Sequence, residues 1–469
     1  MERWLQPALD YISTWIDFQM RASQQPGCVF AVAHRDQVVL EGAIGYADIV
    51  SKEKLTARHR FRVASHSKSF VAAGLMKLRE QRKLRLDDPV GQYVASVHPQ
   101  IAETTIGELL SHSAGIIRDG LDAGQFQGAR PFFSRKELIA DLQKPPAIDP
   151  NTRFKYSNHG YGLLGLVIEA VAGEPYRAWI KREIVDEAGL RETSPDAPLA
   201  AGALLAKGHT PQIHLGRRLV VPSDYTTDAI APAAGFVSTA ADLVRFFAQL
   251  SPRAKRSVLT VASRREMVRR QWRNPNAAFE GYYGLGISSG TAAGWDWFGH
   301  GGALHGYISR TIVIPDQELT LSVLTNATDG LAGFWGDGMI HVLRAFANRG
   351  APSRRVRDWG GRWWTTWGAV DFLPMGDIVM VANPHTFNPL LEASEIEITG
   401  RDKGRIVLAA GYQSYGEPVR RLRSKSGATT EISLSSIRLR PESKVATEMK
   451  RRFGAVNRSA KRRNALAPR

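Results

Sequence analysis

A serine and a lysine stand three residues apart in the stretch "FRVASHSKSF", which spans residues 61–70. A serine hydroxyl is a weak nucleophile until a base removes its proton, and a lysine amine is a base only when burial suppresses its charge. The residues after Ser65 are apolar at helical spacing, so we expect Ser65 to open a buried helix with Lys68 one turn along on the same side. The pattern predicts a nucleophile with its base, or alternatively a helix N-cap with a solvated lysine.

A second serine–lysine pair has the same spacing, at Ser51 and Lys54. It lies in "VSKEKLTARHR", which is polar throughout and predicts a loop. Spacing alone therefore decides nothing, and the apolar helical context favours Ser65 over Ser51 as the nucleophile.

Two further motifs follow along the chain. "FKYSNHGY" supplies Tyr156 and Asn158, and "FGHGGALHGY" supplies His300, Gly301 and Gly302. With these three motifs in this order, S-x-x-K, Y-x-N and H-x-G, the sequence resembles the penicillin-recognising, serine β-lactamase-like hydrolases, in the branch of class C β-lactamases, D-aminopeptidases and related esterases. Segments between the motifs support the resemblance over about residues 25–345, among them "TTIGELLSHSAGI", "GFVSTAADLVRF" and "LSVLTNA".

The resemblance implies a role for each residue of the first two motifs. Ser65 would be the acylated nucleophile and Lys68 its proton acceptor. Tyr156 would exchange a proton with the nucleophile or the leaving group, and Asn158 would hydrogen-bond Lys68 or a substrate carbonyl. Taken alone, Tyr156 would be read as a buried packing residue. Whether Lys68 or Tyr156 is the general base stays open at this point.

The third motif implies an oxyanion hole and departs from the β-lactamases. Gly301 and Gly302 let a strand pass close to a bound substrate, and by resemblance the backbone N–H groups of Ser65 and Ala303 form the oxyanion hole. His300 stands where β-lactamases carry lysine. Because histidine is mostly neutral at pH 7, recognition of a β-lactam carboxylate is not expected, and the motif is more similar to the D-aminopeptidase and esterase branch. For His112 and His305 we expect packing or a loop hydrogen bond.

The order of predicted elements indicates an α/β catalytic domain followed by a small barrel. Strands predicted at "CVFAVAHR" and "QVVLEGAIG" would join strands near residues 282–327 in one α/β-type unit. The resemblance implies that residues 1–350 form a β-lactamase/DD-peptidase-like domain with an antiparallel sheet, flanking helices and a helical region. The turn-rich stretch "NRGAPSRRVRD" predicts a boundary. The short alternating runs "DIVMVA", "SEIEITG", "GRIVLAAG", "EPVRRLRS" and "TTEISLSSIRLRP" then predict a small antiparallel barrel or sandwich. The resemblance implies a lipocalin-like β-barrel, which we place at residues 357–445, and residues 446–469 form a basic tail.

The net charge of +17 raises a nucleic-acid hypothesis. Residues 351–469 contain 22 Lys and Arg against 11 Asp and Glu, so +11 of the net charge lies there and much of it in the tail. We expect that tail to be a solvated, disordered end and expect no nucleic-acid partner.

The first twenty residues predict an amphipathic helix and no signal peptide, since acidic residues interrupt the apolar stripe. No uncharged apolar run is long enough to span a membrane, so no membrane partner is expected. The single cysteine, Cys28, lies in an apolar run and is expected to be buried. Together these features favour a cytoplasmic protein, and a homo-oligomer is left open.

The residues and the resemblance favour a serine hydrolase that forms an acyl-enzyme on small amides, short peptides or esters. The favoured activity is D-aminopeptidase-like release of an N-terminal D-residue, and we expect neither a cofactor nor a metal ion. The alternatives are a carboxylesterase of the same fold, a non-catalytic ligand-binding member, and a nucleic-acid binder that acts through its basic tail.

Overall fold

The computed structural model describes residues 2–275, 280–410 and 414–465. The chain divides into two compact units, one made of Ser23–Gly336 and the other of Met1–Ala22 with Asp337–Arg469. We call the first the catalytic unit, because it contains every predicted site residue, and the second the barrel unit.

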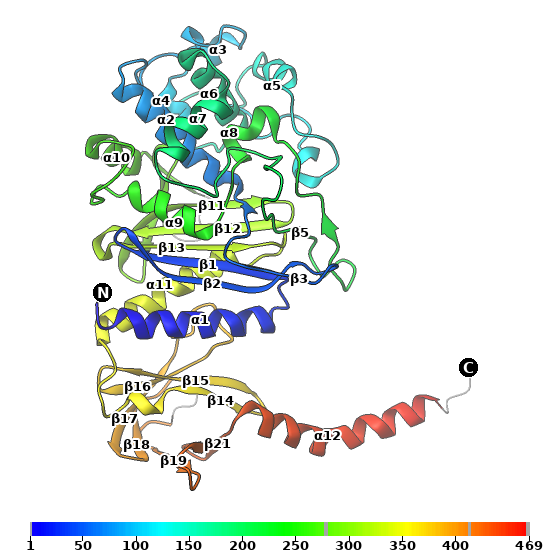
Figure 1. Ribbon diagram of the computed structural model, residues 1–469, viewed down its shortest axis with the longest axis vertical. Coiled ribbons are helices and arrows are strands. Elements are labelled where there is room, and N and C mark those ends of the chain that lie inside the picture. The colour runs from blue at the N-terminus through cyan, green and yellow to red at the C-terminus, as the bar shows by residue number, and fades with distance from the viewer. Residues whose placement is uncertain (1, 276–279, 411–413, 466–469) are drawn as a thin grey trace. The chain divides into compact units, whose positions relative to one another are not determined.

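A nine-stranded antiparallel sheet is the centre of the catalytic unit, with the strand order β3-β2-β1-β13-β12-β11-β10-β9-β8 (Figure 1). Its strands are β1 (Gly27–His34), β2 (Gln37–Asp48), β3 (Glu53–Lys54), β8 (Trp272–Arg273), β9 (Gly281–Tyr283), β10 (Ser288–Ala292), β11 (Trp295–Leu304), β12 (Tyr307–Ile314) and β13 (Leu319–Thr325).

The sheet joins the two ends of the catalytic unit, as the sequence predicted. β1 pairs with β2 on one side and with β13 on the other, so that Cys28 lies opposite Thr325 and His34 opposite Leu319. Seven of the eight residues of β1 are buried, including Cys28. A strand covered on both faces and both edges explains why this segment is apolar without alternation.

Helices cover the sheet and build a separate helical region beside it (Figure 1). α9 packs on β1, β2, β12 and β13, while α2, α6 and α8 pack on one another. α6 ends at Ala172, and Gly173 caps it with a left-handed φ of 72°. The helices are α2 (Ser67–Glu80), α3 (Pro99–Ala102), α4 (Ile106–Leu110), α5 (Arg135–Leu142), α6 (Asn158–Ala172), α7 (Tyr176–Ile180), α8 (Ala231–Ala234), α9 (Ala240–Gln249) and α10 (Val261–Val268).

Two short strand pairs complete the catalytic unit. β4 (Phe61–Arg62) pairs with β7 (Val237–Ser238), and β5 (Gly208–His209) pairs with β6 (Val220–Val221). The first pair leads directly into the turn that carries Ser65.

The barrel unit contains eight antiparallel strands in sequential order. Reciprocal backbone hydrogen bonds between Trp364 and Arg440 bring the first strand against the last, so the sheet is nearly closed. The sequence predicted the runs from β16 onward but not β14 and β15, whose tryptophans and proline obscure the alternation. The strands are β14 (Gly361–Thr365), β15 (Gly368–Met375), β16 (Ile378–Ala382), β17 (Ser394–Gly400), β18 (Lys403–Leu408), β19 (Pro418–Arg423), β20 (Thr429–Leu434) and β21 (Ile437–Leu439).

The N-terminal helix α1 (Leu5–Ala22) belongs to the barrel unit. Phe18 packs against His385 with ring centroids 4.7 Å apart, and Gln19 Nε2 donates to the carbonyl of Pro384 at 2.6 Å. The predicted division into residues 1–350, 357–445 and 446–469 as independently folding parts stays a prediction. The boundary between the two compact units falls inside helix α11 (Ala332–Arg349): its residues up to Gly336 belong to the catalytic unit, and those from Asp337 belong to the barrel unit.

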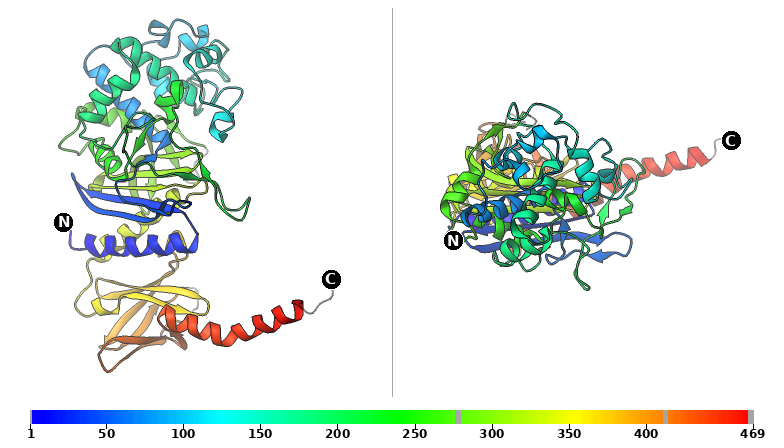
Figure 2. Two further views of the ribbon diagram at one scale, coloured as in Figure 1. Left: turned by 45° about the vertical axis from the view of Figure 1, so that its right-hand side comes forward. Right: turned by 90° about the horizontal axis from the view of Figure 1, so that it is seen from above.

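The basic C-terminal segment is helical, whereas the sequence suggested a disordered end. α12 (Glu442–Ala465) begins with Val445 buried and leads away from the barrel strands (Figure 2). In the described part of the chain, no helix is long and apolar enough to cross a membrane.

Candidate active site

Ser65 lies in a tight 3₁₀ turn, Ala64–His66, directly before α2. The predicted helix therefore starts two residues later than expected, because Ala64 adopts a left-handed φ of 47°. Neighbouring groups hold this strained turn. Ser67 Oγ donates to the Ala64 carbonyl at 2.5 Å, and His66 Nε2 lies 2.9 Å from Thr311 Oγ1. A backbone strain fixed from several sides is typical of functional sites.

The amine of Lys68 lies against the serine, as the spacing predicted. Lys68 Nζ is 3.2 Å from Ser65 Oγ, 2.7 Å from Asn158 Oδ1 and 2.8 Å from the Ala233 carbonyl. The side chain is completely buried. Burial lowers the pKa of Lys68 well below its usual value. The geometry therefore favours a neutral amine, which can accept a proton.

The hydroxyl of Tyr156 reaches the serine from another side. Tyr156 OH donates to Ser65 Oγ at 2.7 Å, and Lys68 Nζ lies 4.7 Å from the Tyr156 ring centroid. Burial raises the pKa of Tyr156, although the hydrogen bond to Ser65 opposes that shift. Tyr156 is therefore protonated near pH 7 and donates toward the nucleophile.

Asn158 opens α6 and connects Lys68 to a carboxylate that the sequence analysis missed. Ser157 caps the helix by accepting from the Gly160 N–H, which places Asn158 in the first turn. Asn158 Oδ1 accepts from Lys68, and its Nδ2 donates to Asp119 Oδ1 at 2.5 Å. The polar pair Arg118-Asp119 inside "SAGIIRDG" was the available sequence signal.

His300 lies on β11 and is oriented by its neighbour Gly301 and by Tyr283, a residue outside the predicted set. Its Nδ1 donates to the Gly301 carbonyl at 2.6 Å, which leaves Nε2 to accept from Tyr283 OH at 3.0 Å. Burial lowers the pKa of His300 well below its usual value. Among the described residues, His300 has no hydrogen bond to Ser65, Lys68 or Tyr156. The structure therefore brings the other four residues together and leaves His300 as a neutral neighbour.

The strand edge after His300 lies close to the Ser65 turn. β10 pairs with β11 only as far as Gly299, and the turn packs against β11 beyond that point. A Cβ atom on Gly302 would lie 2.2 Å from the Val63 carbonyl oxygen and 2.5 Å from Ser309 Oγ. Glycine at this position therefore permits the close approach that an oxyanion hole from Ser65 and Ala303 requires.

We expect Gly302→Ala to lower kcat by about 10²-fold, because the new methyl group pushes β11 away from the Ser65 turn and displaces one oxyanion donor. Gly333→Ala, in α11 (Ala332–Arg349), is the control. A Cβ on Gly333 meets no atom within 4 Å, so activity should stay close to wild type. Steady-state kinetics of the two variants on one ester substrate provide the measurement, and equal losses would contradict the role given to Gly302.

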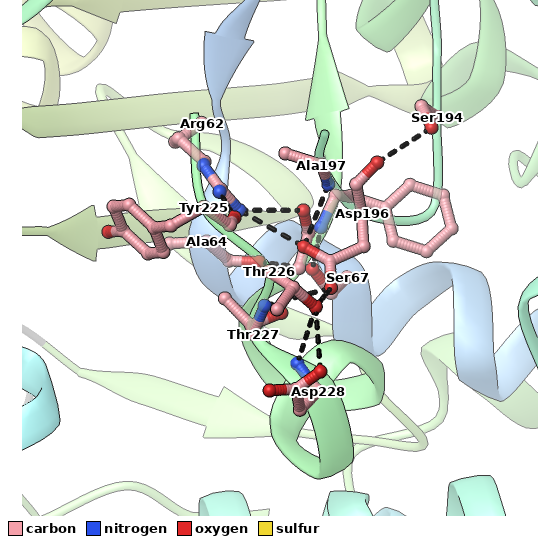
Figure 3. A network of polar contacts seen from close by, with 12 residues as sticks. Arg62, Ala64, Ser67, Ser194, Asp196, Ala197, Tyr225, Thr226, Thr227 and Asp228 are labelled. Carbon is pink, nitrogen blue, oxygen red and sulfur yellow. Dashed lines mark hydrogen bonds and ion pairs between the residues drawn. The ribbon is translucent and has the colours of Figure 1, made fainter. Parts of the chain in front are cut away.

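A buried ion pair between Arg62 and Asp196 is the centre of a polar network (Figure 3). Arg62 Nη1 contacts Asp196 Oδ1 at 3.1 Å, and neither side chain is exposed to solvent. Arg62 Nε also donates to the Ser223 carbonyl at 3.0 Å, while Asp196 Oδ2 accepts from the Thr227 N–H at 2.9 Å. Together they tie β4 to residues 194–228, next to α8, whose Ala233 carbonyl accepts from Lys68.

The residues that the sequence analysis set aside lie away from the nucleophile or pack around it. Ser51 is exposed in a turn, as predicted, whereas Lys54 belongs to β3 and not to a loop, because it pairs with Tyr46; its Nζ lies 3.9 Å from the centroid of the Tyr46 ring. His112 packs 4.2 Å from the Tyr156 ring, and its Nδ1 accepts from the Ser157 N–H. His305 is half-buried beside Gly128. Within the described ranges, no cluster of three or more His, Cys, Asp or Glu side chains could hold a metal ion.

A family model described as Beta-lactamase matches residues 12–338, more than two thirds of the chain. The chain belongs to the Beta-lactamase family. This confirms the resemblance drawn from the three motifs and the fold class, an antiparallel sheet with helices followed by a barrel. The family consists of serine hydrolases, which supports a hydrolase here.

Curated relatives and solved structures agree with the Beta-lactamase family. Protein flp from Staphylococcus aureus (strain COL) is 24% identical over 338 residues, which are 67% of this chain and 62% of that protein. The octameric penicillin-binding protein homologue from Pyrococcus abyssi superposes with a TM-score of 0.65 and 22% identity, over 92% of this chain and 99% of that one. The D-amino acid amidase from Ochrobactrum anthropi SV3 superposes with a TM-score of 0.61 and 21% identity, over 72% and 99%. These structural likenesses concern the fold.

Proposed function

We propose that this protein is a serine hydrolase that forms an acyl-enzyme at Ser65 on small amides, short peptides or esters. The favoured reaction is D-aminopeptidase-like release of an N-terminal D-residue. One observation carries the proposal: Ser65 Oγ lies between a buried amine, Lys68 Nζ at 3.2 Å, and a hydroxyl donor, Tyr156 OH at 2.7 Å. This is the arrangement that activates a weak hydroxyl nucleophile.

The acylation step follows from this geometry. The neutral Lys68 amine takes the proton of Ser65 Oγ as the oxygen attacks the substrate carbonyl carbon, and the carbonyl oxygen becomes an oxyanion held by the N–H groups of Ser65 and Ala303. When the scissile bond breaks, Tyr156 donates its proton to the departing nitrogen or oxygen and recovers one from the Lys68 ammonium. Water then attacks the ester carbonyl by the same steps in reverse order and releases the acid.

The surroundings of the two candidate bases favour Lys68. Burial lowers the pKa of Lys68, which frees its amine to accept a proton, whereas burial raises the pKa of Tyr156, which keeps its hydroxyl protonated. Asn158 and the Ala233 carbonyl accept from the amine, so its lone pair or remaining proton is directed at Ser65.

A panel of substrates tests the proposal and separates the alternatives. It consists of D- and L-aminoacyl anilides, short-chain esters and a chromogenic cephalosporin. D-selective cleavage of the anilides supports the peptidase reading, and turnover of esters alone supports a carboxylesterase. Binding without turnover of any member would support a non-catalytic protein and would contradict the proposal.

We expect the cephalosporin to be cleaved more slowly than the best amide or ester on that panel. His300 is neutral and its Nε2 already accepts from Tyr283 OH, so it supplies no fixed positive charge to a β-lactam carboxylate. Comparison of kcat/KM across the panel gives the answer. A cephalosporin that outperforms every amide and ester would show that His300 does not limit recognition.

A further inference from the structure

The Asn158 amide has a defined orientation because its two ends face different chemistry. Its Nδ2 donates to Asp119 Oδ1 at 2.5 Å, and its Oδ1 accepts from Lys68 Nζ at 2.7 Å. A carboxylate only accepts hydrogen bonds, so it selects the NH₂ end and turns the oxygen toward the lysine. A flipped amide would place two donors against Lys68.

The loop that carries Asp119 is fixed to the first turn of α6. The Arg118 carbonyl accepts from the backbone N–H groups of Asn158 at 2.9 Å and of His159 at 3.2 Å. Gly120 then turns the chain with a φ of 80°, where a Cβ would lie 2.6 Å from Asp141 Oδ2. The Asp119 side chain is 14% exposed and the Arg118 side chain 65% exposed, with Arg118 Nε 3.0 Å from Asp119 Oδ2.

Arg118 and Asp119 therefore carry opposite charges on one short loop near the buried Lys68 amine. The groups that accept hydrogen bonds from this amine are themselves neutral. The Asp119 carboxylate raises the pKa of Lys68 against the dominant effect of burial, and the Arg118 guanidinium lowers it further. The other titratable groups around Lys68 do not carry charge near pH 7. Burial lowers the pKa of His112 and His300, and it raises the pKa of Tyr156 and Tyr161.

We propose that Asp119 is a positioning residue for Lys68, acting through Asn158, and that Asp119 and Arg118 set the proton occupancy of Lys68 in opposite directions. This inference rests on the proposed function, since it assigns a role to Lys68 as the base. Asp119 has no contact with Ser65 among the described residues, and its hydrogen-bonded connection to the nucleophile runs through the Asn158 amide and the Lys68 amine.

The proposal predicts shifts of opposite sign in the acid limb of the pH profile. Asp119→Asn keeps an oxygen acceptor for Asn158 but removes the charge, so Lys68 loses its proton more easily and the limb moves to lower pH, by about 1 unit. Arg118→Gln removes the cation and moves the limb to higher pH. This second shift is smaller, because the exposed guanidinium is screened by solvent and salt. Asp119→Glu keeps the charge and should hold the limb near its wild-type position even where the rate falls.

The experiment measures the rate of covalent inactivation by a fluorophosphonate between pH 5 and 10, which requires no knowledge of the substrate. Asp316→Asn and Arg253→Gln are matched controls, since this exposed ion pair lies away from the site. Melting temperatures verify that every variant is folded. Opposite shifts for the loop variants, with unmoved controls, support the proposal. If the acid limb of the pH profile does not move in folded Asp119→Asn and Arg118→Gln, the proposal is overturned.

The same experiment separates this inference from the proposed function. If the wild type acquires no fluorophosphonate adduct at Ser65, the proposed hydrolase is wrong, and the inference falls with it. If Ser65 is labelled but the limbs do not move, the hydrolase stands and only the role of Asp119 and Arg118 is lost. A lower rate for Asp119→Asn at every pH without a shift also counts against the inference, because a purely structural role produces that result.

Discussion

Ser65→Ala is expected to lower hydrolysis by about 10⁶-fold, which is the scale of losing a serine nucleophile. Ser65 Oγ is the atom that Lys68 Nζ and Tyr156 OH both contact, so nothing else in the site can take over the attack. Ser51→Ala is the matched control. It removes a serine with the same spacing to a lysine, but Ser51 is exposed in a turn and the lysine of that pair lies over Tyr46.

Two measurements check this prediction. Turnover of the best substrate is compared among wild type, Ser65→Ala and Ser51→Ala at equal folded concentration. The wild-type protein is then labelled with the fluorophosphonate, and the modified peptide is mapped by mass spectrometry. An adduct on a residue other than Ser65, or substantial turnover by Ser65→Ala, would require a different nucleophile.

Asp196→Asn is expected to lower the free energy of unfolding by about 3–5 kcal/mol. The substitution keeps the shape of the side chain but leaves the Arg62 guanidinium, which has no solvent exposure, without a counter-charge. Arg62 retains carbonyl acceptors such as that of Ser223, yet neutral acceptors do not offset a buried charge fully. The change in the free energy of unfolding is measured from the midpoints of denaturant unfolding curves, analysed with one common m-value.

The control for this prediction is Asp316→Asn, in the exposed pair with Arg253, where a loss of about 1 kcal/mol or less is expected. Adding Arg62→Met to Asp196→Asn removes the orphaned charge and should recover part of the stability. Equal effects of Asp196→Asn and Asp316→Asn would mean that the buried pair contributes no more than a surface pair.

The sequence was sufficient for the features that depend on local pattern and motif. The apolar helical run after Ser65 and the uninterrupted apolar segment of β1 both correspond to elements of the structure. The three motifs also predicted that Ser65, Lys68, Tyr156 and Asn158 would meet, although they lie on separate elements. The motifs predict this because the spacing within a motif also fixes the local geometry. Ser65 and Lys68, for example, are three residues apart, which places their side chains about one helical turn apart.

Features that depend on contacts between distant loops could not be predicted in this way. Asp119 and Tyr283 carry no distinctive spacing, and their importance comes from the partners that the fold supplies, Asn158 and His300. The 3₁₀ turn at Ser65 replaced the expected helical start because distant residues hold it. Thr311 Oγ1 lies 2.9 Å from His66 Nε2, and the Phe236 N–H donates to Ser67 Oγ at 3.0 Å. β14 and β15 were missed because the adjacent tryptophans of β14 and the proline of β15 hide the period of two.

The pairing of β1 with β13 has a consequence for how the protein is made. β1 and β2 leave the ribosome early, but the partner of the other edge of β1, Leu319–Thr325, is synthesised nearly 300 residues later. At ordinary translation rates this interval lasts for tens of seconds, roughly. During it, an apolar strand has an open hydrogen-bonding edge, a known template for aggregation. A premature stop before residue 319 leaves that edge open permanently, so truncated chains are expected to depend on chaperones or to precipitate.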